Sequence, residues 1–140
     1  MVIEEQGARI EMREQNGVHV HAWSGRPTVK AAERYYAALG AIVDRSRPFV
    51  LLTETAGANV PSAQVRQRIG ELQAELEPRM RPFSIGNVVV VRNTLLRGAL
   101  TALTWLAPSL SEIVYADSLE EGLRVADEMV DSHRRGAAPE

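Results

Sequence analysis

The polar segment at residues 53–62 holds the side chains with which this 140-residue chain could bind a ligand or a partner. It follows a continuous apolar run at residues 49–52, which is typical of a strand buried on both faces. In open α/β sheets, ligands bind beyond the carboxyl ends of the strands. The polar side chains expected at this edge are Thr53, Glu54, Thr55 and Asn59.

A second polar group, formed by Asn93, Thr94 and Arg97, follows the valine run at residues 88–91. Because parallel strands end at the same edge of a sheet, we expect this group beside the first. Arg66 and Arg97 could meet an anion there, since guanidinium donors match phosphate or carboxylate oxygens. Ordinary loop polarity explains the same residues, and the sequence leaves both interpretations open.

Ser62 can play either of two roles. Apolar residues recur after it at helical spacing, so it stands at the start of a helix that runs toward Pro78. Its hydroxyl, or the side chain of Asn59, could cap that helix. Alternatively, Ser62 could accept a phosphate, because the free N–H groups and the positive end of the helix dipole tolerate one.

His19 and His21 alternate with valines and are expected to project from one sheet face beside Trp23. Two histidines at this spacing can bind a metal ion, but the sequence shows no third ligand in a fitting context. We therefore interpret the pair as part of a solvated sheet face. The sequence predicts no metal site and no cofactor.

These residues must be positioned by alternating strands and helices. Asn16-Gly17 between two alternating runs predicts a hairpin, and Thr28 can cap the first helix. The expected strands are residues 8–14, 17–23, 49–52, 87–92 and 112–115, and the expected helices are residues 28–46, 62–77, 94–106 and 118–132. The order β-β-α-β-α-β-α-β-α predicts an α/β fold with a mixed, mostly parallel sheet of about five strands. We expect one domain over residues 1–132 and a disordered tail over residues 133–140.

The element order resembles that of STAS domains, the superfamily of the bacterial anti-sigma-factor antagonists. Residues 88–93, the small-residue-rich helix at residues 95–100 and the closing stretch at residues 115–123 resemble the SpoIIAA-like branch, which is similar to the CRAL-TRIO fold. The resemblance implies a regulatory protein-interaction module with a protein partner and a phosphoacceptor near Ser62. Pro61 and Gln64 stand where the antagonists have an acidic residue and a glycine.

Composition narrows the classes of function. A formal net charge of -2 offers no basic excess for nucleic acid. The absence of cysteine removes disulfides and thiolate catalysis, and it fits a reducing compartment such as the cytoplasm. The chain lacks dinucleotide, P-loop, serine-hydrolase and zinc-protease motifs, so we do not expect an enzyme. We expect residues 1–13 not to act as a signal peptide, and the apolar stretch 95–110 is too short and too polar to span a membrane.

The expected helix at residues 94–106 is apolar around most of its circumference. Such a helix is covered on two sides or pairs with another subunit, so it could form a homodimer surface or the lip of an apolar ligand site. Plain core packing explains most of its residues as well. The alternative to the interaction module is therefore a domain that binds a small apolar or anionic molecule.

Overall fold

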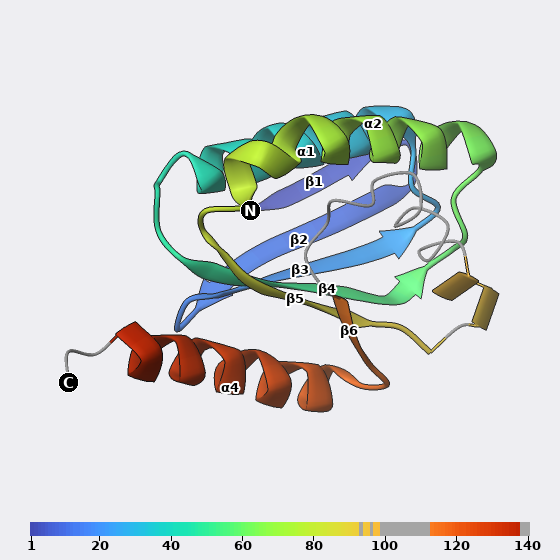
Figure 1. Cartoon of the computed structure of the whole chain (residues 1–140). Helices are drawn as coiled ribbons and strands as arrows, with labels where there is room; N and C mark the ends of the chain where they lie inside the picture. Colours follow the sequence, from blue (N-terminus) through green and yellow to red (C-terminus); the bar gives the residue numbers. More distant parts are fainter. Residues whose placement is uncertain (93, 96, 99–112, 138–140) are drawn as a thin grey trace.

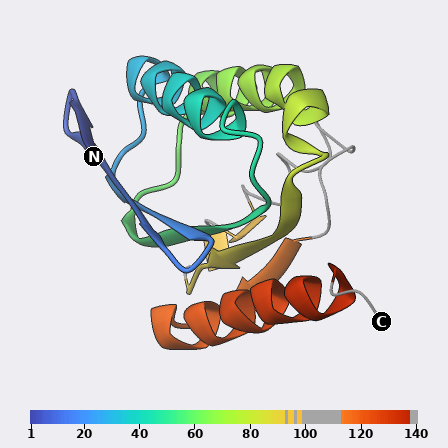
Figure 2. The same cartoon turned by 90° about the vertical axis from the view of Figure 1, so that its left-hand side faces the viewer.

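A computed structural model describes residues 1–92, 94, 95, 97, 98 and 113–137 of the chain. Within this part, a single sheet forms the middle of three layers (Figures 1 and 2). Helices α1 (Val29–Val43) and α2 (Ala63–Met80) cover one face, and helix α4 (Leu119–Ala137) covers the other. No helix among the described residues is long and apolar enough to cross a bilayer.

The described residues form a six-stranded sheet in which the strands lie in the order of the sequence. They are β1 (Val2–Glu5), β2 (Ala8–Gln15), β3 (Val18–Gly25), β4 (Phe49–Ala58), β5 (Ser84–Val90) and β6 (Ile113–Ala116). β1, β2 and β3 pair antiparallel, whereas β3, β4, β5 and β6 pair parallel. The mixed, mostly parallel α/β sheet is therefore confirmed, with one strand more than the sequence predicted.

The additional strand is β1, which pairs with β2 through a turn at Gln6-Gly7. Its four residues are too few to show a clear alternation, and this explains why the sequence did not reveal it. β4 is also longer than expected, because residues 53–58 continue the strand. The predicted helix at residues 94–106 lies mostly outside the described residues, although Thr94, Leu95, Arg97 and Gly98 are helical.

Two helices extend past their predicted ends. α2 includes Pro78, which was expected to stop it, and ends two residues later at Met80. α4 continues to Ala137, so residues 133–137 are helical although the sequence predicted them as part of a disordered tail. α1 begins as predicted, with the Thr28 hydroxyl accepting a hydrogen bond from the Ala31 N–H at 3.1 Å.

The core has two halves, one on each face of the sheet. Ile10, Leu39 and Leu51 are buried between the sheet and α1, whereas Val50 and Leu52 are buried toward α4. Neighbouring residues of β4 thus point to opposite faces, as strand geometry requires.

The prediction that His19 and His21 lie on a solvated sheet face is wrong. Their exposed fractions are 7% and 0%, because both point to the face that α1 covers. The alternation of histidine with valine predicts that the two faces of the strand differ, but it does not show which of them faces solvent. In this fold both faces are covered by helices.

Gly25, at the carboxyl end of β3, contacts both the β1–β2 turn and the segment that leads into α2. It has a φ of +75°, and a Cβ atom there would overlap the carbonyl oxygen of Gly7 in the β1–β2 turn. The Gly25 carbonyl accepts a hydrogen bond from the backbone N–H of Asn59 at 3.0 Å. This glycine therefore ties the β1–β2 turn to the segment that leads into α2.

Candidate functional site

A cavity of about 150 Å³ lies between the sheet and the pair α1 and α2. From the strands it is lined by Trp23, Leu51, Thr53, Thr55, Ala58, Asn87, Val89, Ile113 and Tyr115. From the helices and loops it is lined by Pro27, Tyr35, Tyr36, Leu39, Asn59, Pro61, Ile69, Gly70 and Gln73. Most of these side chains are apolar or aromatic, which is typical of a small-molecule site.

The polar groups in the cavity wall are mostly satisfied within the protein. The Thr55 hydroxyl donates to the Val90 carbonyl at 2.7 Å, and the Tyr36 hydroxyl donates to the side-chain oxygen of Gln73. The indole N–H of Trp23 differs, because it is buried and meets no hydrogen-bond acceptor among the described residues. A buried donor without a partner carries a free-energy cost.

His21 and Tyr35 form a buried pair behind Trp23. The His21 Nδ1 atom lies 2.7 Å from the Tyr35 hydroxyl, and the Trp23 and Tyr35 ring centroids are 4.8 Å apart. Burial, together with a smaller contribution from the neighbouring His19, lowers the pKa of His21 to about 3. Burial also raises the pKa of Tyr35. Both groups are therefore neutral near pH 7, and Tyr35 connects the pair to the cavity wall, which it lines.

Three of the side chains predicted for a binding site meet at this cavity: Thr53, Thr55 and Asn59. Glu54 does not join them, because alternate residues of a strand point to opposite faces. Its carboxylate instead accepts a hydrogen bond from the backbone N–H of Ala56 at 2.9 Å. The prediction grouped neighbours in sequence that the strand separates.

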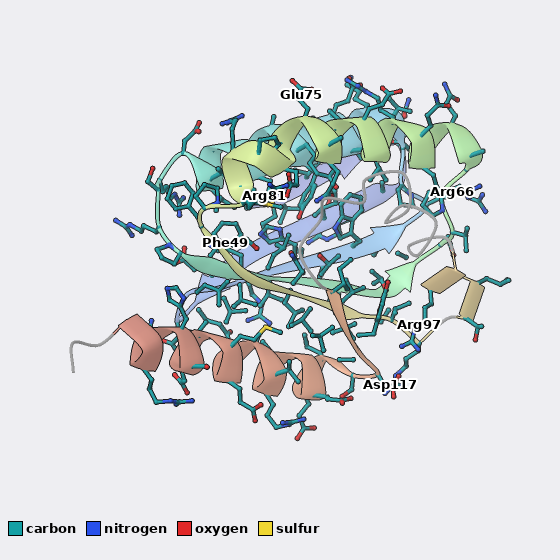
Figure 3. The ribbon with its side chains drawn as sticks, viewed as in Figure 1. Phe49, Arg66, Glu75, Arg81, Arg97 and Asp117 are labelled. Atoms are coloured by element: carbon teal, nitrogen blue, oxygen red, sulfur yellow. The ribbon has the colours of Figure 1, made fainter. Side chains whose placement is uncertain are left out.

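The predicted cationic residues lie at the same end of the sheet, beside rather than inside the cavity (Figure 3). Arg97 stacks over the ring of Tyr115 at 5.1 Å, and its guanidinium is 3.6 Å from the Asp117 carboxylate. Arg66 donates to the Pro61 carbonyl at 2.7 Å. Thr94 is exposed, and Asn93 lies outside the described residues.

Ser62 is the N-cap of α2. Its side-chain oxygen accepts a hydrogen bond from the Val65 N–H at 3.3 Å, so the capping role is confirmed. The residue is exposed, as are Ala63 and Gln64 after it. Its role as a phosphoacceptor stays a prediction.

The sequence did not reveal that aromatic residues form one wall of the site. Trp23, Tyr35 and Tyr36 come from β3 and α1, and their rings pack edge to face. In a chain with only 5% aromatic residues, a Tyr-Tyr pair inside a predicted helix was the available signal. Across the described residues, no cluster of three or more histidines, cysteines, aspartates and glutamates could hold a metal ion.

No family model and no curated protein matches the chain. Two solved structures are similar to it in fold. The crystal structure of an anti-sigma factor antagonist from Mycobacterium paratuberculosis has 19% identity and a TM-score of 0.55, covering 86% of this chain and 94% of that chain. An uncharacterized DUF3478-family protein from Shewanella loihica has 15% identity and a TM-score of 0.64, covering 90% of this chain and 98% of that chain. The latter is described as having a SpoIIAA-like fold. This chain therefore has a SpoIIAA-like fold, as the resemblance in its element order implied.

Proposed function

We propose that this domain is a non-catalytic regulatory module that binds a protein partner through residues 59–62 and the first turns of α2, with Ser62 as its phosphoacceptor. The supporting observation is the exposed hydroxyl of Ser62 at the start of a helix that follows a central strand. A solved structure similar to this chain in fold is named an anti-sigma factor antagonist.

A phosphate on Ser62 would change this surface sharply. The first turn of α2 contains no acidic residue, and Ala63 and Gln64 are exposed and neutral. Phosphorylation adds about -1.5 to -2 charges, which the free N–H groups of the helix start would stabilise. Arg66 lies one turn along, and its guanidinium could exchange the Pro61 carbonyl for a phosphate oxygen.

Intact-mass spectrometry of the protein purified from its own host tests the phosphoacceptor. Wild type should show the added mass of one phosphate, and Ser62→Asn should not. Asparagine is the matched control because it still caps a helix, whereas Ser62→Ala also removes the cap and costs about 1 kcal/mol.

The partner is tested with the same variants as affinity baits in host extract. Ser62→Asp adds charge while keeping a capping side chain, so we expect it to change the capture of a partner that Ser62→Asn and wild type freed of phosphate retain equally. A phosphate mapped to another residue, or identical capture by all three baits, would contradict the proposal.

The cavity supports a second function, the binding of a small apolar molecule. An engineered protein cavity of about 150 Å³ holds benzene, so a single aromatic ring fits the volume observed. Trp23 lines the cavity, so an acceptor on the ring that reached its buried indole N–H would give this donor the partner that it lacks among the described residues. We therefore propose a monocyclic aromatic carbonyl compound as the ligand class for this function.

Acetophenone and ethylbenzene form a matched pair of probes, because they have nearly the same shape and differ in the carbonyl oxygen. In thermal unfolding, we expect acetophenone to stabilise wild type more, and at 100-fold excess over its Kd to add about 2.7 kcal/mol. Trp23→Phe should abolish the difference between the two probes. No stabilisation by either probe would indicate that the cavity is filled by the protein's own packing.

A further inference from the structure

A second concavity, of about 210 Å³, lies at the opposite end of the sheet, where β3 and β4 begin. It is bounded by the β2–β3 turn, the segment between α1 and β4, and the last turns of α4. Phe49 contributes to its wall, and Figure 3 shows this residue far from the labelled Arg66 and Arg97 at the other end. The site is therefore separate from both Ser62 and the aromatic cavity.

Positive charge dominates the lining of this concavity. It contains Arg45, Arg47 and Arg134 but a single carboxylate, that of Glu14. Arg45 is partly neutralised, since its guanidinium is 3.4 Å from Glu14. The side chains of Arg47 and Arg134 make no ion pair or hydrogen bond within the part of the chain that the structure describes. Two arginines whose side chains have no ion-pair partner among the described residues thus line the same hollow from different segments.

The wall between them is built from buried groups. His19 is 7% exposed, its Nε2 atom is 3.5 Å from the Glu14 carboxylate, and its ring packs edge to face on Phe49 with centroids 5.6 Å apart. A Cβ atom at Gly17 would lie 3.8 Å from the Arg134 guanidinium. The Arg134 side chain therefore packs against the β2–β3 turn at this glycine. The imidazole is therefore a nearly buried polar group in the wall of a cationic hollow.

We propose that this concavity binds inorganic phosphate or a small phosphate monoester, with Arg47 and Arg134 as the principal ligands and His19 in the wall behind them. Planar guanidinium groups donate paired hydrogen bonds to phosphate oxygens, and they remain charged at all relevant pH values. A water molecule occupies about 30 Å³ of liquid, so the hollow accommodates a tetrahedral ion with part of its hydration. The proposal is independent of the function proposed for Ser62.

Isothermal titration with sodium phosphate, against sodium chloride at equal ionic strength, tests the site. We expect Arg47→Gln/Arg134→Gln to bind phosphate at least about tenfold more weakly than wild type, because two charge-assisted hydrogen bonds are lost. Arg26→Gln/Arg135→Gln is the matched control, since it removes the same charge from two exposed arginines that do not line the hollow. Equal binding by both double variants, or none by wild type, would overturn the proposal.

Amide chemical shifts locate the anion and separate this site from the others. Phosphate should shift Gly17 and His19, and leave the Trp23 indole N–H unchanged. A Ser62→Asn protein should bind phosphate as wild type does, so failure here and failure of the Ser62 proposal are distinguishable. Glycerol 3-phosphate, used as a second probe, distinguishes the two sources of a phosphate group. If only the ester binds, the site is assigned to a phosphorylated metabolite. If the ester and inorganic phosphate bind equally, the site is assigned to the free ion. Shifts centred on α2 instead of Gly17 would contradict the assignment.

Discussion

As the pH falls below about 6, we expect this domain to lose about 1.4 kcal/mol of stability per pH unit through His21 alone. The ordinary pKa of histidine, 6.5, applies to the unfolded chain, whereas burial lowers the pKa of His21 in the folded protein to about 3. The unfolded state therefore binds the proton first, and protonation favours unfolding. The loss begins near 6.5 and grows until the pH reaches the folded-state pKa.

The total effect could approach roughly 5 kcal/mol, which is comparable to the whole stability of many small domains. The pKa of His19 is also lowered by burial, so its contribution has the same sign. Urea denaturation at about pH 7 and about pH 4.5 measures the slope.

A double variant, His21→Phe/Tyr35→Phe, is the matched control for this prediction. It removes the titrating imidazole together with the hydroxyl that lies 2.7 Å from it, so no buried polar partner is left behind. His21→Phe alone would strand the Tyr35 hydroxyl and cost about 1–3 kcal/mol at every pH. If wild type and the double variant lost stability in parallel on acidification, the acid sensitivity would come from other groups.

Gly25→Ala should destabilise the fold by about 3 kcal/mol or more. A left-handed backbone costs a residue with a Cβ roughly 1–2 kcal/mol, and here the new atom also overlaps the Gly7 carbonyl oxygen. Because that oxygen belongs to the backbone, relief requires the β1–β2 turn to move. Urea denaturation followed by circular dichroism measures the change in the free energy of unfolding.

Gly7→Ala separates the two contributions to this cost. Gly7 has a φ of +89°, but no atom lies within 4 Å of a Cβ built on it. Its substitution should therefore show the backbone strain without the overlap, at about 1–2 kcal/mol. Equal losses for the two variants would mean that the Gly7 carbonyl relaxes freely.

Local patterns predicted most of the elements. The Asn16-Gly17 turn, the capping positions of Thr28 and Ser62, and the apolar strand runs are all decided by near neighbours in sequence. The structure confirms them. β1 was not predicted because it is recognised by its pairing with β2, and a pattern of four residues does not reveal that pairing.

Contacts between distant segments could not be predicted in the same way. Alternation separates Thr53 from Glu54, but it does not say which face receives α1 and which receives α4. For the same reason the sequence predicts His19 and His21 on a solvated face, whereas the structure buries them in the core. The concavity proposed to bind phosphate is lined by Arg47 and Arg134, which are far apart in sequence and come to one site only through the packing of α4.

The strand order has a consequence for how this chain acquires its structure. In the sheet that the described residues form, each strand pairs with the strands next to it in the sequence, so no strand must be inserted between two that are already paired. Short separations between pairing partners shorten the loops that must close and speed folding. The sheet can therefore be assembled strand by strand as the chain leaves the ribosome, with β4 adding to the edge of β3, β5 to β4 and β6 to β5.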